Sequence, residues 1–268
     1  MQTEFPRVSI LVISYNQERF IREALESALQ QDYDNLEVVV ADDASRDGTR
    51  AIIRELAQRY PQRLKPVFNR SNVGITANSN IGLAHCSGEF IAFMGGDDVL
   101  LPDKIAQQVA WFAQDEQRVL CGHDVEWIDA DGALLGIRTS NLVPLHDGRG
   151  AARFIRHGTP YTAASVMVRR SRIPAYGFHP SLPVVSDWKL WIDVIGTEGT
   201  YGYIPGIWAR YRRHSGNVTA KLNWKVTRDV LLTAVLSAWH LHGRYLKDWA
   251  HYFLVRPILK RVRRKAHG

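Results

Sequence analysis

Cysteine is scarce in this 268-residue sequence. Cys86 and Cys121 are the two present, and they lie far apart without a C-x-x-C pair. Their number and spacing exclude a disulfide framework and give no zinc-binding pattern. We therefore expect a reducing compartment and, with it, a cytoplasmic location.

Long hydrophobic runs are also lacking. The longest, residues 230–239, falls short of the roughly 18 residues that a membrane-spanning helix needs, so we expect no segment that crosses a bilayer. No charged-then-apolar leader precedes the hydrophobic run that begins at Val8, so secretion is not predicted. No G-x-G-x-x-G motif follows that run, which argues against a nicotinamide-dependent dehydrogenase.

Acidic residues are absent from the end of the chain, where basic residues crowd together. They contribute to a formal net charge of +7 and are Arg256, Lys260, Arg261, Arg263, Arg264 and Lys265. Such a block is either a solvated tail or a site for an anionic membrane surface, and both interpretations stay open. Nucleic acid is not expected as a partner, because acidic clusters elsewhere would repel its phosphates.

Strand and helix patterns alternate over the first half of the chain. Strands are predicted at residues 8–13, 36–41, 64–68, 90–94 and 121–129, and helices at 20–30, 49–60, 76–85 and 103–114. This alternation is typical of an α/β fold with a mainly parallel sheet and helices on both faces. The pattern then fades and returns as a short strand at 165–169 and a helix at 188–194.

The C-terminal segment differs from the rest. Residues 223–264 predict one or two helices, broken near Gly243 and Pro257. We therefore divide the chain into an α/β domain, residues 1–220, and a C-terminal helical segment, residues 221–268. Its aromatic and basic composition suits an amphipathic helix at a membrane interface, and a helix packed on the α/β domain is the alternative for residues 223–242.

Acidic residues gather where two predicted strands end. Asp42, Asp43 and Asp47 follow one strand, and Asp97 and Asp98 follow another after two glycines. Carboxylates repel one another, so their collection at the ends of strands indicates a ligand, most simply Mg²⁺ or Mn²⁺ bound together with substrate phosphates. For Asp47 we favour a role as a helix cap or turn former.

Two further motifs lie in loops at the same positions of the pattern. Tyr15-Asn16-Gln17-Glu18 follows the first strand, where an open α/β sheet offers loops to a ligand, although Asn16 could equally cap the next helix. Asn72-Val73-Gly74 precedes a predicted helix, and its glycine could allow backbone to approach a nucleotide.

These motifs together resemble the inverting nucleotide-sugar glycosyltransferases of family 2, which have the GT-A fold. The likeness runs from Val8 to about Ala220, and motif order and spacing make it specific. Its segments are Tyr15–Glu18, Ala41–Thr49, Asn72–Gly74 and Gly88–Asp98, followed by Val185–Trp191 and Tyr211–Asn217. Three positions depart from the family pattern: Gly95 in place of an acid, Ser79 in place of an arginine and Ser186 in place of a glutamate.

The resemblance implies roles for individual residues. Asp187 is the expected general base, with an N-cap of its helix as the structural alternative. Asp97, Asp98 and His214 are the expected ligands of Mn²⁺ or Mg²⁺, which leaves open whether Asp97 or Asp98 is the main one. The nucleotide sugar is expected to meet Tyr15, Asn16, Glu18, Asp42, Asp43, Asn72, Asp97 and Arg212.

The resemblance also implies an activity and a place of action. We expect transfer of a sugar from a UDP-sugar to a saccharide acceptor, with inversion, in the synthesis of a cell-surface polysaccharide. The acceptor is expected to be lipid-linked, with the segment from Trp249 to Lys265 holding the enzyme at the inner face of the cytoplasmic membrane. A nucleotide-sugar-binding protein without turnover is the alternative.

Overall fold

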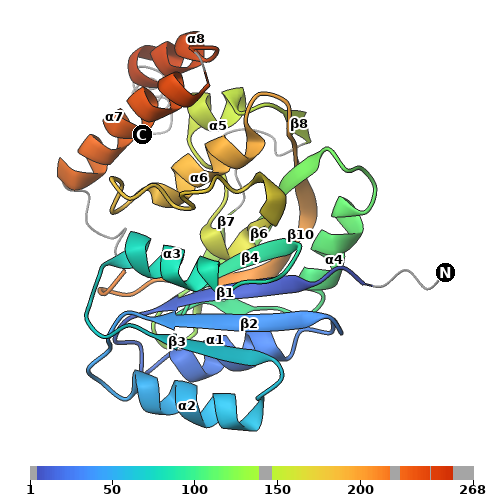
Figure 1. Ribbon diagram of the computed structural model, residues 1–268, viewed down its shortest axis with the longest axis vertical. Helices are drawn as coiled ribbons and strands as arrows, with labels where there is room; N and C mark the ends of the chain where they lie inside the picture. Colours follow the sequence, from blue (N-terminus) through green and yellow to red (C-terminus); the bar gives the residue numbers. More distant parts are fainter. Residues whose placement is uncertain (1–4, 139–146, 218–223, 242, 256–268) are drawn as a thin grey trace.

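A computed structural model describes residues 5–138, 147–217, 224–241 and 243–255. Within them, ten strands form one sheet. Eight of these follow the order β3-β2-β1-β4-β9-β6-β10-β5, and the other two are β7, which pairs with β6, and β8, which pairs with β10. Four parallel strands come first: β3 (Leu64–Phe68), β2 (Leu36–Asp42), β1 (Val8–Ser14) and β4 (Phe90–Gly95). The expected α/β fold with a mainly parallel sheet is confirmed (Figure 1).

The second half of the sheet is mixed. The short strand β9 (Met167–Arg169) runs antiparallel between β4 and β6 (Arg118–Ile128), and β10 (Thr200–Arg212) is parallel to β6. The remaining strands are β5 (Val99–Leu100), β7 (Leu134–Arg138) and β8 (Gly148–Arg149). The strand expected at residues 165–169 is thus shorter, because residues 163–165 form a 3₁₀ turn.

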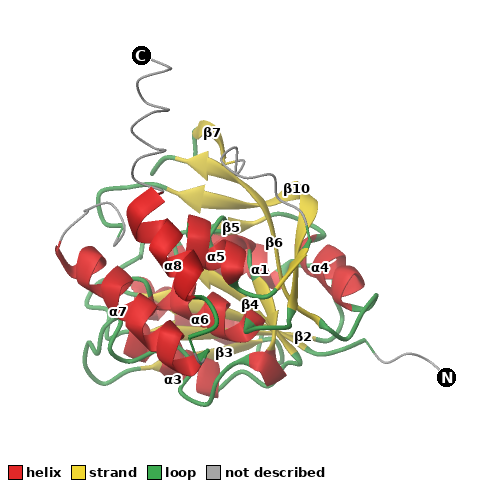
Figure 2. Cartoon of the chain, turned by 90° about the horizontal axis from the view of Figure 1, so that it is seen from above, coloured by secondary structure: helices red, strands yellow, loops and turns green. Residues whose placement is uncertain are grey.

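Helices cover both faces of the sheet. On one face lie α1 (Ile21–Leu29), α2 (Thr49–Arg59) and α4 (Lys104–Phe112), and on the other α3 (Ile75–Ala84), α5 (Ala152–His157) and α6 (Ser186–Ile195). Helices α7 (Trp224–His240) and α8 (Leu246–Ala250) join the second group, as the view from above shows (Figure 2). A π-helical turn, residues 251–255, follows α8.

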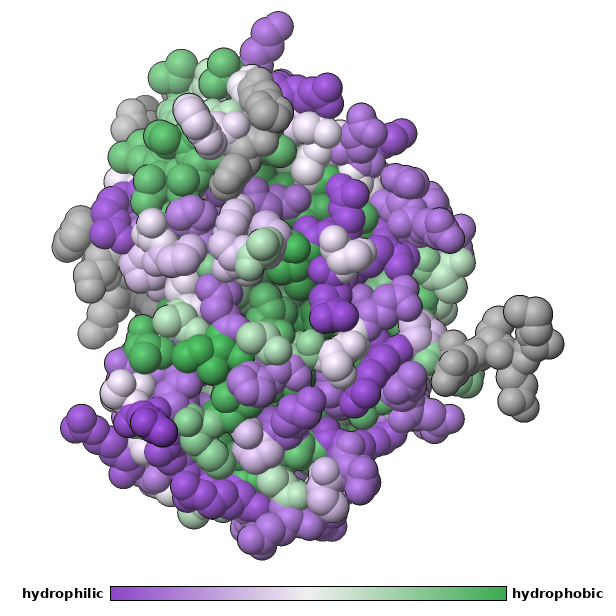
Figure 3. Space-filling view, viewed as in Figure 1, coloured by the Kyte–Doolittle hydropathy of each residue, from purple (hydrophilic) through white to green (hydrophobic). Residues whose placement is uncertain are grey.

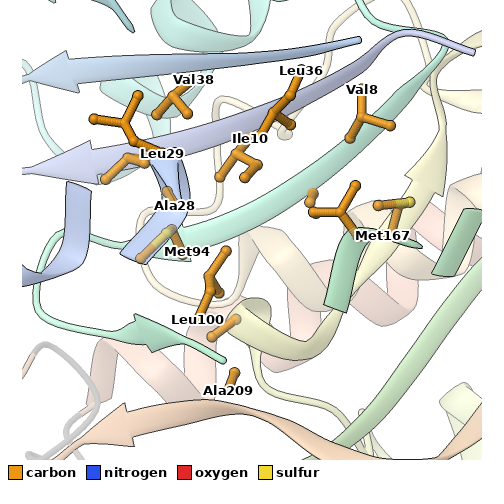
Figure 4. Packing of buried hydrophobic residues seen from close by; sticks show 14 of the residues in the cluster. Val8, Ile10, Ala28, Leu29, Leu36, Val38, Met94, Leu100, Met167 and Ala209 are labelled. Carbon is orange, nitrogen blue, oxygen red and sulfur yellow. The ribbon is translucent and has the colours of Figure 1, made fainter. Parts of the chain in front are cut away.

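The core lies on both sides of the central strands because side chains alternate along a strand. Val8, Ile10 and Val12 of β1 pack toward α1 and α2, whereas Leu11 packs in the opposite cluster, beneath Gly82 of α3. Figure 4 shows Ile10 of β1 on the side of the sheet where Ala28 and Leu29 of α1 lie. Burial on both faces explains why these strands read as continuous hydrophobic runs in the sequence.

The C-terminal helices pack on the domain, as the alternative interpretation for residues 223–242 predicted. Val230 and Ala234 of α7 contact the core cluster on the α6 side, and the chain breaks at Gly243 as expected. Trp249 is buried against Trp188, with ring centroids 5.6 Å apart, so the prediction that Trp249 begins a membrane-contacting tail is wrong. The basic residues from Arg256 onward and the break at Pro257 lie outside the described residues.

Helix length and hydrophobicity bear on membrane crossing. Among the helices that the structure describes, none is both long enough and apolar enough to traverse a bilayer.

A buried carboxylate joins the amino ends of the central strands. Glu37 of β2 accepts hydrogen bonds from the Ser9 hydroxyl at 2.5 Å, the Ser87 backbone N–H at 2.6 Å and the Lys65 ammonium at 3.2 Å. Burial alone would raise the pKa of Glu37, but hydrogen bonds from Ser9, Ser87 and Lys65 lower it to about 2. Glu37 therefore fixes β1, β3 and the segment before β4 to β2.

We expect this carboxylate to make stability depend on pH. Because its pKa is depressed in the folded protein, its contribution is full above the unfolded value near 4.5 and is lost as the pH falls toward about 2. Measured by urea unfolding, the free energy of unfolding should fall between pH 6 and pH 3 by up to about 2 kcal/mol more in wild type than in Glu37→Gln. Parallel pH profiles for the two proteins would contradict this assignment.

Candidate active site

The candidate site lies where the parallel strands end. Ser14 of β1 is in register with Asp42 of β2, and Ile13 is in register with Gly95 of β4. The loops after these three strands therefore leave the sheet side by side, which is the edge where open α/β sheets bind ligands. The end of β10 brings the segment after Arg212 to the same edge, since Arg212 donates its N–H to Asp98.

The loops after β1 and β2 are joined by hydrogen bonds of Asn16 and Glu18, two residues that were expected to contact the nucleotide sugar. Asn16 donates its backbone N–H to the Ser45 hydroxyl at 2.8 Å and accepts the N–H of Arg46 on its side-chain oxygen at 2.9 Å. A Glu18 carboxylate oxygen accepts the N–H of Gly48 at 2.5 Å. Asn16 and Glu18 thus shape the loops, which leaves backbone and Tyr15 to face a ligand.

The conformation of these loops is unusual. Asn16 and Ala44 have positive φ, 50° and 61°, a region that residues with a Cβ rarely adopt. Asn16 does not cap α1, whose N-cap residue is Phe20, so that alternative is wrong. Asp47 forms a turn as expected, because its carboxylate accepts the N–H of Thr49 at 3.1 Å.

Asp42 is fully buried and bound by protein groups. Its Oδ1 accepts the Ser45 N–H at 3.1 Å and the Arg50 Nε–H at 2.5 Å, and its Oδ2 accepts the Ser45 hydroxyl. The ion pair with Arg50 compensates for the removal of the charge from water. Asp42 therefore holds its own loop in shape.

Asp43 joins the second motif to the Asn72-Val73-Gly74 turn. Its carboxylate accepts the N–H of Val73 at 2.8 Å, the N–H of Gly74 at 2.9 Å and the side-chain amide of Asn69 at 3.1 Å. Asn72 donates its side-chain amide to the Asp43 carbonyl at 3.3 Å. Gly74, at φ 87°, allows the turn that aims these N–H groups at Asp43.

The two adjacent acids after β4 have different surroundings. Asp98 is buried, and its oxygens accept the backbone N–H of Arg212 at 3.1 Å and of Gly95 at 3.2 Å. Burial, and then the neighbouring charge of Asp97, raise the pKa of Asp98 above its usual range, and the two N–H groups oppose that shift. Asp98 therefore holds the end of β10 against the loop after β4.

Asp97 is the acid of this pair that faces the candidate site. Its Oδ2 lies 2.9 Å from Nε2 of His214 and 3.2 Å from the side-chain amide of Asn217, and both its side chain and that of His214 keep some exposure. The His214 ring packs on Phe20, with centroids 4.9 Å apart. The two side chains are thus hydrogen-bonded to each other. A carboxylate suits Mg²⁺ or Mn²⁺, and an imidazole nitrogen is a common ligand of divalent metals.

The glycine before these acids gives Asp97 its room. A Cβ at Gly95 would lie 2.5 Å from Oδ1 of Asp97. The departure from the family pattern at Gly95 is thus linked to the present orientation of the Asp97 carboxylate.

Arg212 is placed differently from the expectation that it meets the nucleotide sugar, for which its charge would suit the diphosphate. Its side chain is 2% exposed, and its guanidinium donates to the carbonyls of Asp97 and Asp129 and to the Glu23 carboxylate at 2.6 Å. It also lies over the Phe20 ring, 5.1 Å from the centroid. A guanidinium with this many protein partners positions the loops and is not available to clamp a diphosphate.

Asp187 lies in the first turn of α6 and is partly exposed. It does not cap the helix, because the N-cap residue is Val185 and the Asp187 carboxylate accepts the N–H of Trp188. The neighbouring Ser186 is buried and lies 3.2 Å from the Thr76 hydroxyl of α3. The serine that departs from the family pattern therefore joins the starts of α3 and α6.

A residue outside the motifs supports the segment before Asp187. The Asp229 carboxylate of α7 is buried and accepts the N–H of Val184 at 2.8 Å. Sequence inspection missed Asp229, as it missed Asn217, Phe20 and Glu23, because their roles depend on contacts between distant segments. Of these four residues, Asn217 alone lies within one of the sequence motifs, the Tyr211–Asn217 segment around His214, and that position was the one indication of its role.

No group of three or more histidine, cysteine or acidic residues that could hold a metal occurs among the described residues. Asp97 and His214 would have to share a cation with oxygens of a ligand, which is how Mg²⁺ sites formed with substrate phosphates are built.

Comparison with known proteins places these features in context. The sequence pattern described as Glycosyl transferase family 2 matches residues 9–166. The Bacillus subtilis protein EpsE, whose name describes it as a glycosyltransferase, is 31% identical over 74% of this chain and 69% of its own length. An uncharacterized Mycobacterium tuberculosis protein is 36% identical over 79% of this chain, and the match spans 60% of that protein's length.

Solved structures share the fold at low sequence identity. TarS of Staphylococcus aureus in complex with UDP-GlcNAc superposes with a TM-score of 0.74 at 19% identity, covering 92% of this chain and 71% of that one. The mannosyltransferase PcManGT of Pyrobaculum calidifontis in complex with GDP-Man and Mn²⁺ gives a TM-score of 0.59 at 20% identity, covering 92% of this chain and 75% of the other.

We expect the two adjacent acids to differ in their effect on stability. Asp98→Ala removes the acceptor of the buried Arg212 N–H and of the part-buried Gly95 N–H and should lower the free energy of unfolding by about 1–3 kcal/mol. Asp97→Ala removes partly exposed contacts and should change it by less than about 1 kcal/mol. Urea unfolding at pH 7 followed by circular dichroism measures both, and equal losses in the two variants would contradict the assignment.

Proposed function

Because the chain belongs to glycosyltransferase family 2, we propose that it transfers a sugar from a UDP-sugar to a hydroxyl of a saccharide acceptor with inversion at the anomeric carbon. One observation carries the proposal. The loops of the separate motifs meet at a single edge of the sheet and leave Tyr15, Asp97, His214 and Asp187 partly exposed while their neighbours are bound internally.

The donor would lie over the loops after β1 and β2. Tyr15 is 45% exposed and offers a ring next to the Asn16 backbone, where a nucleobase could stack. Asp42 and Asp43 would influence the nucleobase mainly by fixing their loops, since their carboxylates already accept hydrogen bonds from protein groups. Asn16, Glu18 and Asn72 have the same kind of role, with backbone as the surface that meets the nucleotide.

A divalent cation would be bound at this site together with the donor diphosphate. Asp97 and His214 would hold Mn²⁺ or Mg²⁺, and this cation would neutralise charge on the departing diphosphate. Asp98 would support Asp97 from behind. Arg212 would act as a positioning residue, because it binds the Asp97 carbonyl.

Asp187 would be the general base. The acceptor oxygen attacks the anomeric carbon on the face opposite the diphosphate, the bond from that carbon to the phosphate oxygen breaks, and the acceptor proton passes to the Asp187 carboxylate. The N–H of Trp188 orients this carboxylate. The hydrogen bond between Thr76 and Ser186 joins α6, which carries Asp187, to the start of α3, which follows the Asn72-Val73-Gly74 turn. Attack on the opposite face gives inversion.

The acceptor is proposed to be a lipid-linked saccharide of a cell-surface polysaccharide, extended in the cytoplasm at the inner face of the membrane. The cations crowded after Arg256 support this location, because each basic residue near anionic lipid contributes about 1 kcal/mol of attraction.

The base assignment predicts a separation of rate from binding. Asp187→Asn should lower the rate of UDP release from a UDP-sugar by about 10²–10⁴-fold, because the amide cannot accept the proton. Donor affinity from calorimetry should change less than about twofold, since the base acts on the acceptor. Asp32→Asn, an exposed change between α1 and β2, is the control and should leave both values unchanged.

Two results would contradict the proposal. An unchanged rate in Asp187→Asn would remove this residue from the mechanism. Donor binding without any UDP release by the wild-type protein, with saccharide acceptors supplied, would indicate a nucleotide-sugar-binding protein without turnover.

The cation assignment predicts a loss of metal binding. In the presence of UDP, Asp97→Ala and His214→Ala should weaken Mn²⁺ affinity at least about tenfold, measured from the free-Mn²⁺ signal in electron paramagnetic resonance. His85→Ala, which alters an exposed histidine at the end of α3, is the matched control. Wild-type affinity in Asp97→Ala would show that the cation lies elsewhere, and chelation by EDTA should abolish UDP release.

A further inference from the structure

Helix α7 carries its polar and apolar residues on unexpected faces. Asp229, Thr233 and Ser237 are fully buried, at 0% exposure. Leu231, Val235 and Trp239 are exposed, at 52%, 65% and 81%. Residues four apart lie along one side of a helix, so these are two lines on nearly opposite faces, and the large apolar side chains form the outer one.

The inner line is held by specific bonds. Asp229 accepts the N–H of Val184 at 2.8 Å, and Thr233 donates its hydroxyl to the Asp229 carbonyl at 2.7 Å. Val230 and Ala234, beside that line, pack against the core cluster on the α6 side. A rotation of α7 that buried the outer line would remove the Asp229 carboxylate from the Val184 N–H and leave that N–H without its acceptor, which is unfavourable. The orientation of the apolar face is therefore fixed by the fold.

Charges around this face have one sign. The described residues of α7 and α8 include two acids: Asp229 is buried, and Asp248 is half-buried and pairs with Arg156 at 2.5 Å. Arg244 and Lys247 are exposed. Leu246, 61% exposed, continues the apolar surface. Figure 3 shows hydrophobic residues gathered over the α7 and α8 region.

We propose that the outer face of α7, formed by Leu231, Val235 and Trp239 and continued by Leu246, inserts into the interface of an anionic lipid membrane. An apolar helix face with a Trp and a cationic border is the pattern of interfacial helices. The basic residues after Arg256 in the sequence add attraction to the same surface. A second copy of the chain is a poorer occupant, because a symmetric contact would bring the two cationic borders together.

The face is connected to the candidate site. The Asp229 side chain, on the inner line, binds the backbone of Val184, which precedes Asp187 by three residues. A membrane at α7 would thus lie next to the segment that positions the proposed base. In this respect the inference rests on the proposed function, since a lipid-linked acceptor would then arrive beside Asp187.

Vesicle binding by the full-length protein tests the proposal. The protein is sedimented with phosphatidylcholine vesicles and with vesicles that also contain phosphatidylglycerol. The triple variant Leu231→Ser, Val235→Ser, Trp239→Ser should bind the anionic vesicles on the order of tenfold or more weakly than wild type. The matched control is Leu134→Ser, Leu135→Ser, Ile137→Ser, which removes exposed apolar residues from β7 and should leave binding unchanged.

Further measurements separate the possible outcomes. Thermal unfolding should show both triple variants folded, because all the altered side chains point outward. Wild-type vesicle affinity in the α7 variant would overturn the proposal. It would also be overturned if the wild-type protein did not bind vesicles and instead formed a dimer that the α7 substitutions dissociate. UDP release in solution, measured alongside, should persist in the α7 variant, so failure of the transferase proposal would be recognised separately.

Discussion

Buried carboxylates bound by backbone N–H groups are the constraint on which the candidate site depends. An ionised carboxylate removed from water is unfavourable unless charged or polar partners surround it. Asp43 binds the turn at Val73 and Gly74, Asp98 binds the end of β10, and Asp229 binds the segment before α6. Each hydrogen bond joins segments far apart in the sequence, and movement of the loop would break it and leave the carboxylate without its N–H donor.

This constraint changes how the acidic motifs are understood. Their number indicated a ligand, yet Asp42, Asp43 and Asp98 are buried and bound by protein groups. Asp97 also bonds to His214 and Asn217, but it is the partly exposed acid of its pair. The adjacency of Asp97 and Asp98 follows from two different tasks at one strand end. One side chain anchors the backbone, and the other is held by that anchoring in a position where it can meet a cation.

Hydrogen-bonded carboxylates occur at both the amino ends and the carboxyl ends of the parallel strands, but they have different roles there. At the amino ends, Glu37 is surrounded by hydroxyl, amide and ammonium donors that leave no oxygen for a ligand. At the carboxyl ends, comparable bonds hold loops open around partly exposed side chains. The same kind of bond extends to Asp229 on the inner side of α7, which supports the segment before Asp187, while the opposite side of that helix presents an apolar face to its surroundings.

The sequence by itself determined the α/β architecture, the family and the loops at which chemistry was expected, because these depend on local periodicity and motif spacing. It did not reveal β10, where Gly202, Pro205 and Gly206 obscure the strand pattern, and it could not distinguish Asp97 from Asp98. Tertiary structure decided that Arg212 is internal, that Trp249 is buried and that α7 faces outward with its apolar side. These properties arise from contacts between segments distant in the chain, and no local pattern encodes which side chain such a contact will bury.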